Sequence, residues 1–307
     1  MKGVILAAGK GSRLYPITQH IPKPLLPLAN RITLEYAFDR LKEIGVTEIC
    51  IVVGENEEAM RRALGTGHQF GVQLSYVRQT EPKGLAHAVG FAKEFVGGDS
   101  FVLYLGDAIY SHDFKALAEK FVSTGCANLN VVKPVDDPRR FGVANVDGDR
   151  ITKLVEKPAE PESNLAMAGL YFFGPQIWRV LPDLKPSPRG EFEITDAIQT
   201  LVDQGEDVRA GIYEHLWFDT GTLDSFLDTS RFLAGEVALI GEGADLSGSP
   251  VGHVVIGDGA SVQCDGIEDA VVLPGARVHV KGKIRRSILA GNVAFDADIA
   301  EQIEFGT

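Results

Sequence analysis

The sequence predicts an α/β protein with a doubly wound, mostly parallel, Rossmann-like sheet, followed by a short left-handed β-helix. Three observations predict this. An apolar run at Lys2–Ala8 leads into glycines, as a buried parallel strand leads into a ligand loop. Segments with strand and helix patterns then alternate along the chain, which indicates βαβ crossovers. Near the C-terminal end, a short apolar motif repeats at intervals of 17 and 16 positions.

The elements of the first half follow in order from their apolar patterns. A helix begins near Thr33, because Leu34, Phe38 and Leu41 share one face, and it stops at Gly45. Further strands are expected at Glu48–Val53, Val72–Val77 and Phe101–Leu105, and further helices at Glu57–Leu64 and Leu85–Phe95.

In the second half of the sheet domain, strand and helix patterns no longer alternate regularly. Asp147-Gly148-Asp149 separates Gly142–Val146 from Ile151–Val155, which is typical of a hairpin. Met167–Phe173 has the pattern of another buried strand. Helices are expected near Pro175–Leu181, Thr195–Asp203 and Leu223–Ala234.

After about Glu236 the helical periodicity ends and the repeat begins. Its copies start at Ile256, Leu273 and Leu289, spaced close to one coil of a three-sided hexapeptide-repeat β-helix. So short a stack should pack on the domain before it or on another subunit. A homo-oligomer with a subunit contact through this stack is our hypothesis. We therefore predict a large domain over residues 1–235 and a β-helix over residues 236–307.

Composition and charge limit the compartment and the kind of partner that are expected for the protein. Hydrophobic residues make up 45% of the chain and no run is long enough to span a bilayer, so we expect no membrane association. The N-terminal apolar run is too short for a secretory signal, and three scattered cysteines fit reduced thiols, so a cytoplasmic protein is predicted. The net charge of −12 argues against nucleic acid as a partner.

The N-terminal segment is nevertheless cationic. The first acidic residue is Glu35, and five cations precede it: Lys2, Lys10, Arg13, Lys23 and Arg31. Glycines around Gly9 and Gly11 would let backbone N–H groups approach phosphate oxygens, so a triphosphate could bind here. The spelling fits neither a P-loop nor a dinucleotide fingerprint. The alternative is a plain turn with exposed cations.

This segment resembles the signature of the sugar-1-phosphate nucleotidylyltransferases, LAAGxGxRLxPxT followed by PKPLLP, over Leu6–Thr18 and Pro22–Pro27. The resemblance continues through further motifs to about residue 235: Gln79–Ala88, Leu105–Asp107, Phe141–Val143, Val155–Pro158, Arg189–Asp196 and Trp217–Gly221. With its β-helical tail, the chain is similar to the long form of glucose-1-phosphate thymidylyltransferase. The resemblance implies a nucleotidyltransferase that makes dTDP-glucose and pyrophosphate from dTTP and glucose 1-phosphate with Mg²⁺.

The resemblance also implies roles for individual residues. The nucleotide would be bound by Leu6, Ala8, Gly9, Gly11, Arg13, Gln79, Gly84 and Asp107, and the sugar phosphate by Lys23, Gly142, Glu156, Lys157 and Trp217. The metal ligands would be Asp107 and Asp219. Arg13, Lys23, Asp107, Lys157 and Asp219 would be the catalytic set. Without the resemblance, each aspartate reads as a turn or cap residue, and Glu156 with Lys157 as a surface ion pair.

Several alternatives stay open at this point. Thymine and uracil share the edge that Gln79 would contact, so UTP is an alternative to dTTP. Ala108 stands where many family members have asparagine, which leaves the preferred hexose 1-phosphate open. A non-catalytic homologue that binds sugar nucleotides is a rival, although the five catalytic positions keep their charges. Zinc chemistry and a Ser-His-Asp hydrolase are disfavoured because neither HExxH nor GxSxG occurs.

Overall fold

The structure is a computed structural model that describes residues 1–307, and it divides into two compact units. The sheet unit comprises Met1–Gly9 and Ala37–Trp217, and the coil unit comprises Lys10–Tyr36 and Phe218–Thr307. The cationic segment Lys10–Tyr36 thus belongs to the same unit as the C-terminal repeats. None of the helices combines the length and apolar character that a membrane crossing needs.

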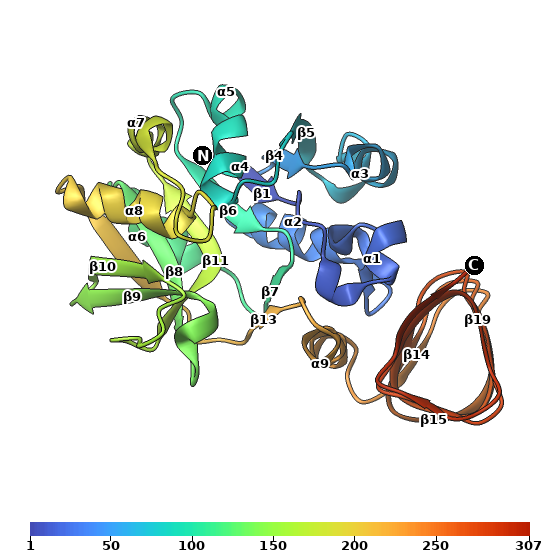
Figure 1. Ribbon diagram of the computed structural model, residues 1–307. Coiled ribbons are helices and arrows are strands. Elements are labelled where there is room, and N and C mark those ends of the chain that lie inside the picture. The colour runs from blue at the N-terminus through green and yellow to red at the C-terminus, as the bar shows by residue number, and fades with distance from the viewer. The chain divides into compact units, whose positions relative to one another are not determined.

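The sheet unit is built on nine strands in the order β5-β4-β1-β6-β11-β8-β12-β10-β9 (Figure 1). Their bounds are β1 Lys2–Leu6, β4 Glu48–Val53, β5 Gln73–Arg78, β6 Phe101–Leu105, β8 Asn128–Pro134, β9 Gly142–Asp147, β10 Arg150–Glu156, β11 Leu165–Phe173 and β12 Val208–Ile212. The expected hairpin is present as β9 and β10, which pair antiparallel.

The prediction of a mostly parallel sheet holds for its N-terminal part and for one later pair, β8 with β12. Strands β5, β4, β1 and β6 are parallel, whereas β11 pairs antiparallel with both β6 and β8. The sheet as a whole is therefore mixed. Its parallel half still brings the carboxyl ends of β1, β4, β5 and β6 to one edge, where α/β sheets bind ligands.

Helices connect the strands. Their bounds are α2 Thr33–Glu43, which enters from the coil unit, α3 Glu57–Leu64, α4 Leu85–Phe91, α5 Lys93–Val96, α6 Lys115–Thr124, α7 Ile177–Val180 and α8 Ile194–Asp203; a short strand β7 spans Ala108–Tyr110. The single helix predicted at Leu85–Phe95 is wrong. It breaks at Ala92, whose N–H bonds to the carbonyl of Val89 three residues back, and this tightened turn ends α4.

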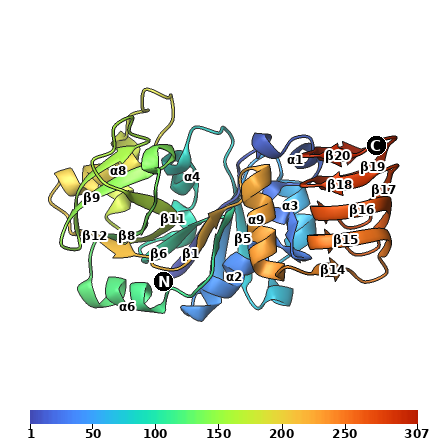
Figure 2. The same cartoon turned by 90° about the horizontal axis from the view of Figure 1, so that it is seen from below.

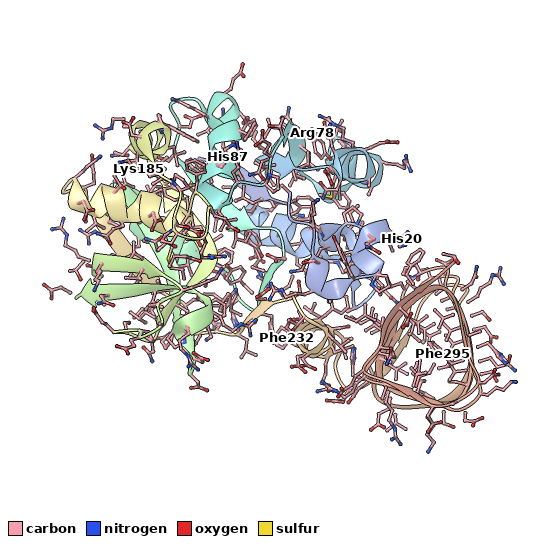
Figure 3. All side chains as sticks on the ribbon, in the orientation of Figure 1. His20, Arg78, His87, Lys185, Phe232 and Phe295 are labelled. Carbon is pink, nitrogen blue, oxygen red and sulfur yellow. The ribbon has the colours of Figure 1, made fainter.

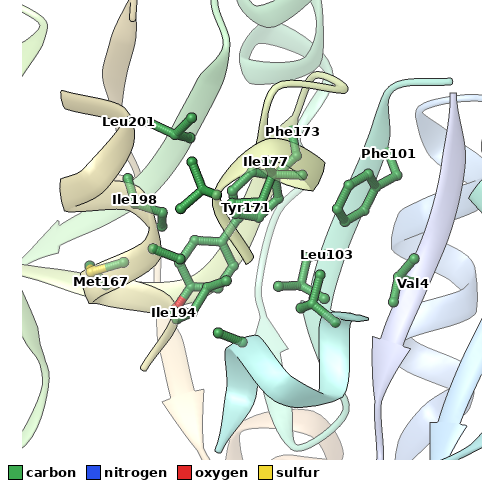
Figure 4. Close-up of a cluster of buried hydrophobic side chains, with 14 of the residues drawn as sticks. Val4, Phe101, Leu103, Met167, Tyr171, Phe173, Ile177, Ile194, Ile198 and Leu201 are labelled. Atoms are coloured by element: carbon green, nitrogen blue, oxygen red, sulfur yellow. The ribbon is translucent and has the colours of Figure 1, made fainter. Parts of the chain in front are cut away.

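A large core cluster of the sheet unit lies between the sheet and the helices α4, α7 and α8 (Figure 4). Ile194, Ile198 and Leu201 recur at helical spacing on α8 and are each at most 2% exposed. They pack with Tyr171 and Phe173 of β11. This packing fixes the first turn of α8, which carries residues of the candidate site.

The coil unit contains parallel strands wound into a coil that Figure 1 shows end-on as three-sided. The strands are β14 Ala238–Ile240, β15 Asp245–Ile256, β16 Ser261–Val272, β17 Arg277–Val280, β18 Lys283–Arg285, β19 Ile288–Phe295, β20 Ile299–Ala300 and β21 Ile303–Gly306. Figure 2 shows these strands stacked on one another. Asp245 pairs with Ser261, and Ser261 with Arg277, an offset of 16 residues, and the offset is 17 for Val271 with Ile288 and 15 for Ile288 with Ile303. The offset agrees with the predicted repeat. Apolar side chains fill the coil, and Phe295 packs against them (Figure 3).

The rest of the coil unit packs on this coil. It comprises α1 Ile17–His20, the hairpin of β2 Pro27–Leu28 and β3 Arg31–Ile32, the end of β13 Trp217–Asp219, and α9 Leu223–Ala234. His20 of α1 stacks on Phe305 at 3.8 Å between ring centroids, and the Asn30 amide donates to the carbonyl of Ile256. The predicted helix Leu223–Ala234 is confirmed with both ends, because Thr222 and Ser225 cap its start.

Candidate active site

The cationic loop of the coil unit is held in a compact turn. Gly11 has a φ of 64° and precedes a 3₁₀ turn at Ser12–Leu14. A Cβ at Gly11 would lie 3.1 Å from the Cβ of Lys23, so glycine suits both the backbone conformation and the space. The hydroxyl of Thr18 donates to the Gly11 carbonyl at 2.8 Å. The turn is therefore fixed before any ligand binds.

Three predicted catalytic side chains converge in the coil unit. A Cβ built on Gly221 would lie 2.8 Å from Nη2 of Arg13 and 2.9 Å from Oδ1 of Asp219. The Lys23 ammonium lies 3.8 Å from the same Asp219 oxygen, and its side chain is only 9% exposed. Residues far apart in sequence thus bring two cations and one carboxylate together. Such a group can bind phosphate oxygens and a divalent cation at once.

In the sheet unit, the predicted nucleotide loop leaves the carboxyl end of β1. The N–H of Gly106 donates to the Leu6 carbonyl at 3.0 Å, so Asp107, the next residue, follows β6 beside the end of β1. The Asn56 amide holds the Ala7 carbonyl at 2.9 Å. Leu6, Ala8 and Asp107 therefore lie at the sheet edge where the sequence predicts a ligand.

Gln79 and Gly84 form a second part of the sheet unit's site. Gln79 is 7% exposed, and its Nε2 lies 3.3 Å from the Gly84 carbonyl and 3.0 Å from Nδ1 of His87. Because the amide nitrogen already has these two partners, Oε1 is the atom of Gln79 that can accept a hydrogen bond from a ligand. A Cβ at Gly84 would lie 2.6 Å from the carbonyl oxygen of Phe192, so only glycine fits there.

Glu156 and Lys157 lie on the same side although they are neighbours in sequence. β10 ends at Glu156, and Lys157 adopts a left-handed φ of 44°, which is strained for a residue other than glycine. This turn brings the Lys157 ammonium within 3.4 Å of Oε1 of Glu156. Strain of this kind is common at functional sites.

Gly142 and Trp217 are placed near this pair by different contacts. A Cβ at Gly142 would lie 2.7 Å from the Met167 sulfur and 3.2 Å from Oε2 of Glu156. The Trp217 ring packs on Phe141 at 5.2 Å between centroids. Its indole Nε1 is buried with no hydrogen-bond partner, which leaves a donor for a ligand.

The sequence motif Arg189–Asp196 adds residues that received no role from the sequence alone. Arg189 Nη1 lies 3.1 Å from Oε1 of Glu193 and 3.4 Å from Oε1 of Glu156. Burial, and then the charge of Glu156, raise the pKa of Glu193, and the same causes in the same order raise that of Asp196. The Thr195 hydroxyl donates to Oε2 of Glu156 at 2.6 Å. Only their place in that motif could have singled these residues out.

The predicted metal ligands belong to different units. Asp107 lies in the sheet unit and Asp219 in the coil unit, and no group of three or more His, Cys, Asp or Glu side chains is arranged to hold a metal ion. Each of the two aspartates offers carboxylate oxygens, the ligand type that Mg²⁺ prefers, and Mg²⁺ fills the rest of its shell with waters and substrate oxygens. The donor chemistry therefore fits this ion and does not suit zinc.

Comparison with known proteins gives the family. The nucleotidyl transferase family model matches residues 2–236. The low-salt glycan biosynthesis nucleotidyltransferase Agl11 of Haloferax volcanii is 44% identical over 241 residues, which cover 78% of this chain and 68% of Agl11. A glucose-1-phosphate thymidylyltransferase of Streptomyces griseus is 36% identical over 91% of this chain and 79% of its own.

A solved structure agrees with these relatives. It comes from Bacillus anthracis, is assigned as a glucose-1-phosphate thymidylyltransferase and contains sucrose. It has a TM-score of 0.71 and 38% sequence identity, and the match covers 77% of this chain and 96% of that one. The family model spans both stretches that carry the candidate site. The chain therefore belongs to the nucleotidyl transferase family and is a nucleotidyltransferase.

Proposed function

We propose that this enzyme transfers the thymidylyl group of dTTP to glucose 1-phosphate and releases dTDP-glucose and pyrophosphate. The observation that carries the proposal is the convergence of Arg13, Lys23 and Asp219 around Gly221. The names of the Streptomyces griseus relative and of the Bacillus anthracis structure support the choice of substrates.

The nucleotide would lie along the glycine loop and against Gln79. Backbone N–H groups of the loop, through Gly9 and Gly11, and the Arg13 guanidinium would bind the phosphates. Oε1 of Gln79 would accept from N3–H of the base, which thymine and uracil have and cytosine lacks. This orientation favours dTTP or UTP. A methyl contact is worth only about 1–3 kcal/mol, so UTP is the alternative substrate.

The sugar phosphate would occupy the other part of the sheet unit's site. Glu156 would accept hydrogen bonds from sugar hydroxyls, Lys157 would bind the phosphate, and the buried donor of Trp217 and the Gly142 backbone would add contacts. Lys23 would hold the attacking phosphate close to the α-phosphorus. Ala108 follows Asp107 with no amide to offer, so hexose selection would depend mainly on Glu156.

The reaction would be a single in-line displacement. A phosphate oxygen of glucose 1-phosphate forms a bond to the α-phosphorus as the bond from that phosphorus to the β-phosphate oxygen breaks. Because the nucleophile is already an anion, positioning and charge neutralisation by Arg13, Lys23 and Lys157 would provide most of the acceleration. Asp107 and Asp219 would hold Mg²⁺, which when bound neutralises phosphate charge.

Several features of the whole chain are part of the proposal. The family model ends at residue 236, which supports a catalytic domain over 1–235 and a β-helix over 236–307. The three-sided cross-section and the 16-residue offset support a left-handed β-helix. Val237, Ile240 and Val251 are exposed apolar residues on this coil, which supports a homo-oligomer formed through it. Three unpaired, buried cysteines suit the cytoplasm.

A pyrophosphate-release assay tests the proposal. The enzyme with Mg²⁺ and glucose 1-phosphate is offered dTTP, UTP, CTP, ATP and GTP in turn, and dTTP is then offered with other hexose 1-phosphates. We expect the highest kcat/KM for dTTP with glucose 1-phosphate, less with UTP and almost none with CTP. A non-catalytic homologue would release no pyrophosphate from any pair, and a higher kcat/KM with UTP would make the enzyme a uridylyltransferase.

A further inference from the structure

Glu156 is held from two sides in the sheet unit. Its Oε2 accepts from the hydroxyl of Thr195 at 2.6 Å, while its Oε1 lies 3.4 Å from both Lys157 Nζ and Arg189 Nη1. The short contact is therefore with a neutral hydroxyl and the longer ones are with cations. The Glu156 side chain is 17% exposed, so it stays open to a ligand.

Thr195 is well placed to fix this carboxylate. It is 1% exposed in the first turn of α8, whose apolar face is locked into the core. A carboxylate has only acceptors, so the Thr195 hydroxyl must donate, and the direction of the bond is set. Each carboxylate oxygen keeps a further lone pair for a sugar hydroxyl.

The space around the pair is also restricted. A Cβ at Gly142 would lie 2.8 Å from the Thr195 hydroxyl and 3.2 Å from Oε2 of Glu156. The Met167 sulfur lies 3.7 Å from the same hydroxyl. Without the hydroxyl, Oε2 would lose its short hydrogen bond while both cations stayed beside Oε1, so the carboxylate would turn toward them.

We propose that Thr195 is the positioning residue for sugar recognition: its hydroxyl holds the Glu156 carboxylate away from Lys157 and Arg189, in the orientation that accepts a hydroxyl of the sugar phosphate. The inference rests on the proposed function, because Glu156 contacts a sugar hydroxyl only if a hexose 1-phosphate binds here. It predicts that loss of the Thr195 hydroxyl weakens binding of the sugar phosphate and leaves binding of the nucleotide unchanged.

The test compares Thr195→Val with Thr195→Ser. Valine keeps the size and removes the hydroxyl, so the KM for glucose 1-phosphate should rise about tenfold, while the KM for dTTP changes by less than about twofold. Serine keeps the hydroxyl and should restore the wild-type KM. Thr200→Val is the matched control, because Thr200 lies on the same helix and its hydroxyl donates only to the Asp196 carbonyl.

A second readout separates positioning from a structural role. The wild-type enzyme is assayed with the 2-, 3-, 4- and 6-deoxy analogues of glucose 1-phosphate to find which hydroxyl it needs. In Thr195→Val, the discrimination against that one deoxy analogue should shrink, and in a Glu156→Gln background the valine substitution should have no further effect on it. If Thr195→Val does not fold, Thr195→Cys keeps the size, donates weakly and should give an intermediate rise.

The outcomes separate this inference from the proposed function. A wild-type enzyme that releases no pyrophosphate with any sugar phosphate contradicts the proposed function. A wild-type enzyme that discriminates among the deoxy analogues, with unchanged discrimination in the valine or cysteine variant, overturns the role of Thr195. Equal rises in both KM values, or the same rise in Thr200→Val, would also overturn it, because they indicate a general disturbance of α8.

Discussion

Arg13 offers the sharpest test of the proposal that the glycine loop binds phosphate. Its guanidinium would stabilise charge on the transferred and departing phosphates, and removal of one such donor commonly costs about 100-fold to 1000-fold in turnover. We expect Arg13→Ala to lower kcat by at least about 100-fold, with an unchanged unfolding midpoint, because the side chain is exposed. The measurements are pyrophosphate release and thermal unfolding.

The control for this variant is Arg62→Ala. Arg62 is an exposed arginine on α3 that pairs with Glu58 at 2.6 Å, and exposed pairs of this kind contribute little to stability. Its kcat should match the wild type within about twofold. Near-normal turnover in Arg13→Ala would remove Arg13 from the catalytic set.

Asp107 tests the proposed metal ligand. Asp107→Asn keeps the shape of the side chain and removes its charge, so the Mg²⁺ concentration that gives half-maximal turnover should rise at least about tenfold. Turnover is measured against Mg²⁺ concentration, and the heat of Mg²⁺ binding with dTTP present gives an activity-independent readout. The same Mg²⁺ dependence in wild type and variant would show that Asp107 is not a ligand.

Individual site residues were predictable from the sequence only where a motif contained them. Lys157 could be named, but its left-handed backbone could not, since nothing in Glu156-Lys157-Pro158 reveals a φ of 44°. Thr195 lies in a quoted motif, yet its contact with Glu156 depends on how α8 packs against β10. Such contacts join residues that are distant in sequence, so periodicity cannot reveal them.

At the scale of elements, His253 joins the coil to α9. It is fully buried, its Nε2 lies 3.0 Å from the Ser230 hydroxyl, and its Nδ1 lies 3.3 Å from the Gly235 carbonyl. Burial lowers the pKa of His253 below its usual 6.5, against raising effects from the Gly235 carbonyl and from Asp269 and Glu236. Protonation therefore favours the unfolded chain.

The neutral, buried His253 stabilises the folded protein fully above about pH 6.5. This stabilisation is lost as pH falls from there toward the lowered pKa that His253 has in the folded state. We expect the urea midpoint to fall between about pH 7.5 and about pH 5.5 in the wild type, and to fall less in His253→Gln. His279→Gln is the control, because His279 is an exposed histidine on the same coil. Equal slopes in wild type and His253→Gln would contradict this.

Two strands of the sheet were not predicted, and the reason is physical. β8 contains Asn128 and Asn130, which are fully buried, so its apolar pattern is interrupted. Their amide nitrogens donate inside the sheet: Asn130 donates to Oδ1 of Asn128, and Asn128 donates to the Phe172 carbonyl. Oδ1 of Asn130 is buried with no hydrogen-bond partner. β12 is short and includes Arg209 and Gly211. Both strands depend on neighbours supplied by the fold.

At the scale of the whole molecule, the coil and the cationic segment Lys10–Tyr36 form one compact unit. α1 packs on β21, and α9 packs on β15 and β16. The sequence predicted the coil itself, because its repeat is visible as a period. It did not predict that Lys10–Tyr36 would group with the coil, since that contact joins segments more than two hundred positions apart.

This grouping predicts the result of removing the coil. A chain that ends at Gly235 keeps almost all of the family match at 2–236, yet it loses the partners of α1 and α9. Ser230, which is fully buried, would lose His253, and His20 and Asn30 would lose Phe305 and Ile256. We expect faster amide hydrogen exchange across Lys10–Tyr36 and a kcat/KM for dTTP at least about tenfold lower.

Phe305→Ala in the full chain removes the stacking contact with His20 but keeps the coil, and it is the milder comparison. It should raise exchange in α1, leave that in Leu223–Ala234 unchanged, and lower kcat/KM by less than the truncation does. Exchange and turnover should respond together in this series because the loop proposed to bind phosphate and the helix that packs on the coil share one compact unit. A truncated chain with wild-type exchange across Lys10–Tyr36 would mean that the phosphate loop is ordered without the coil.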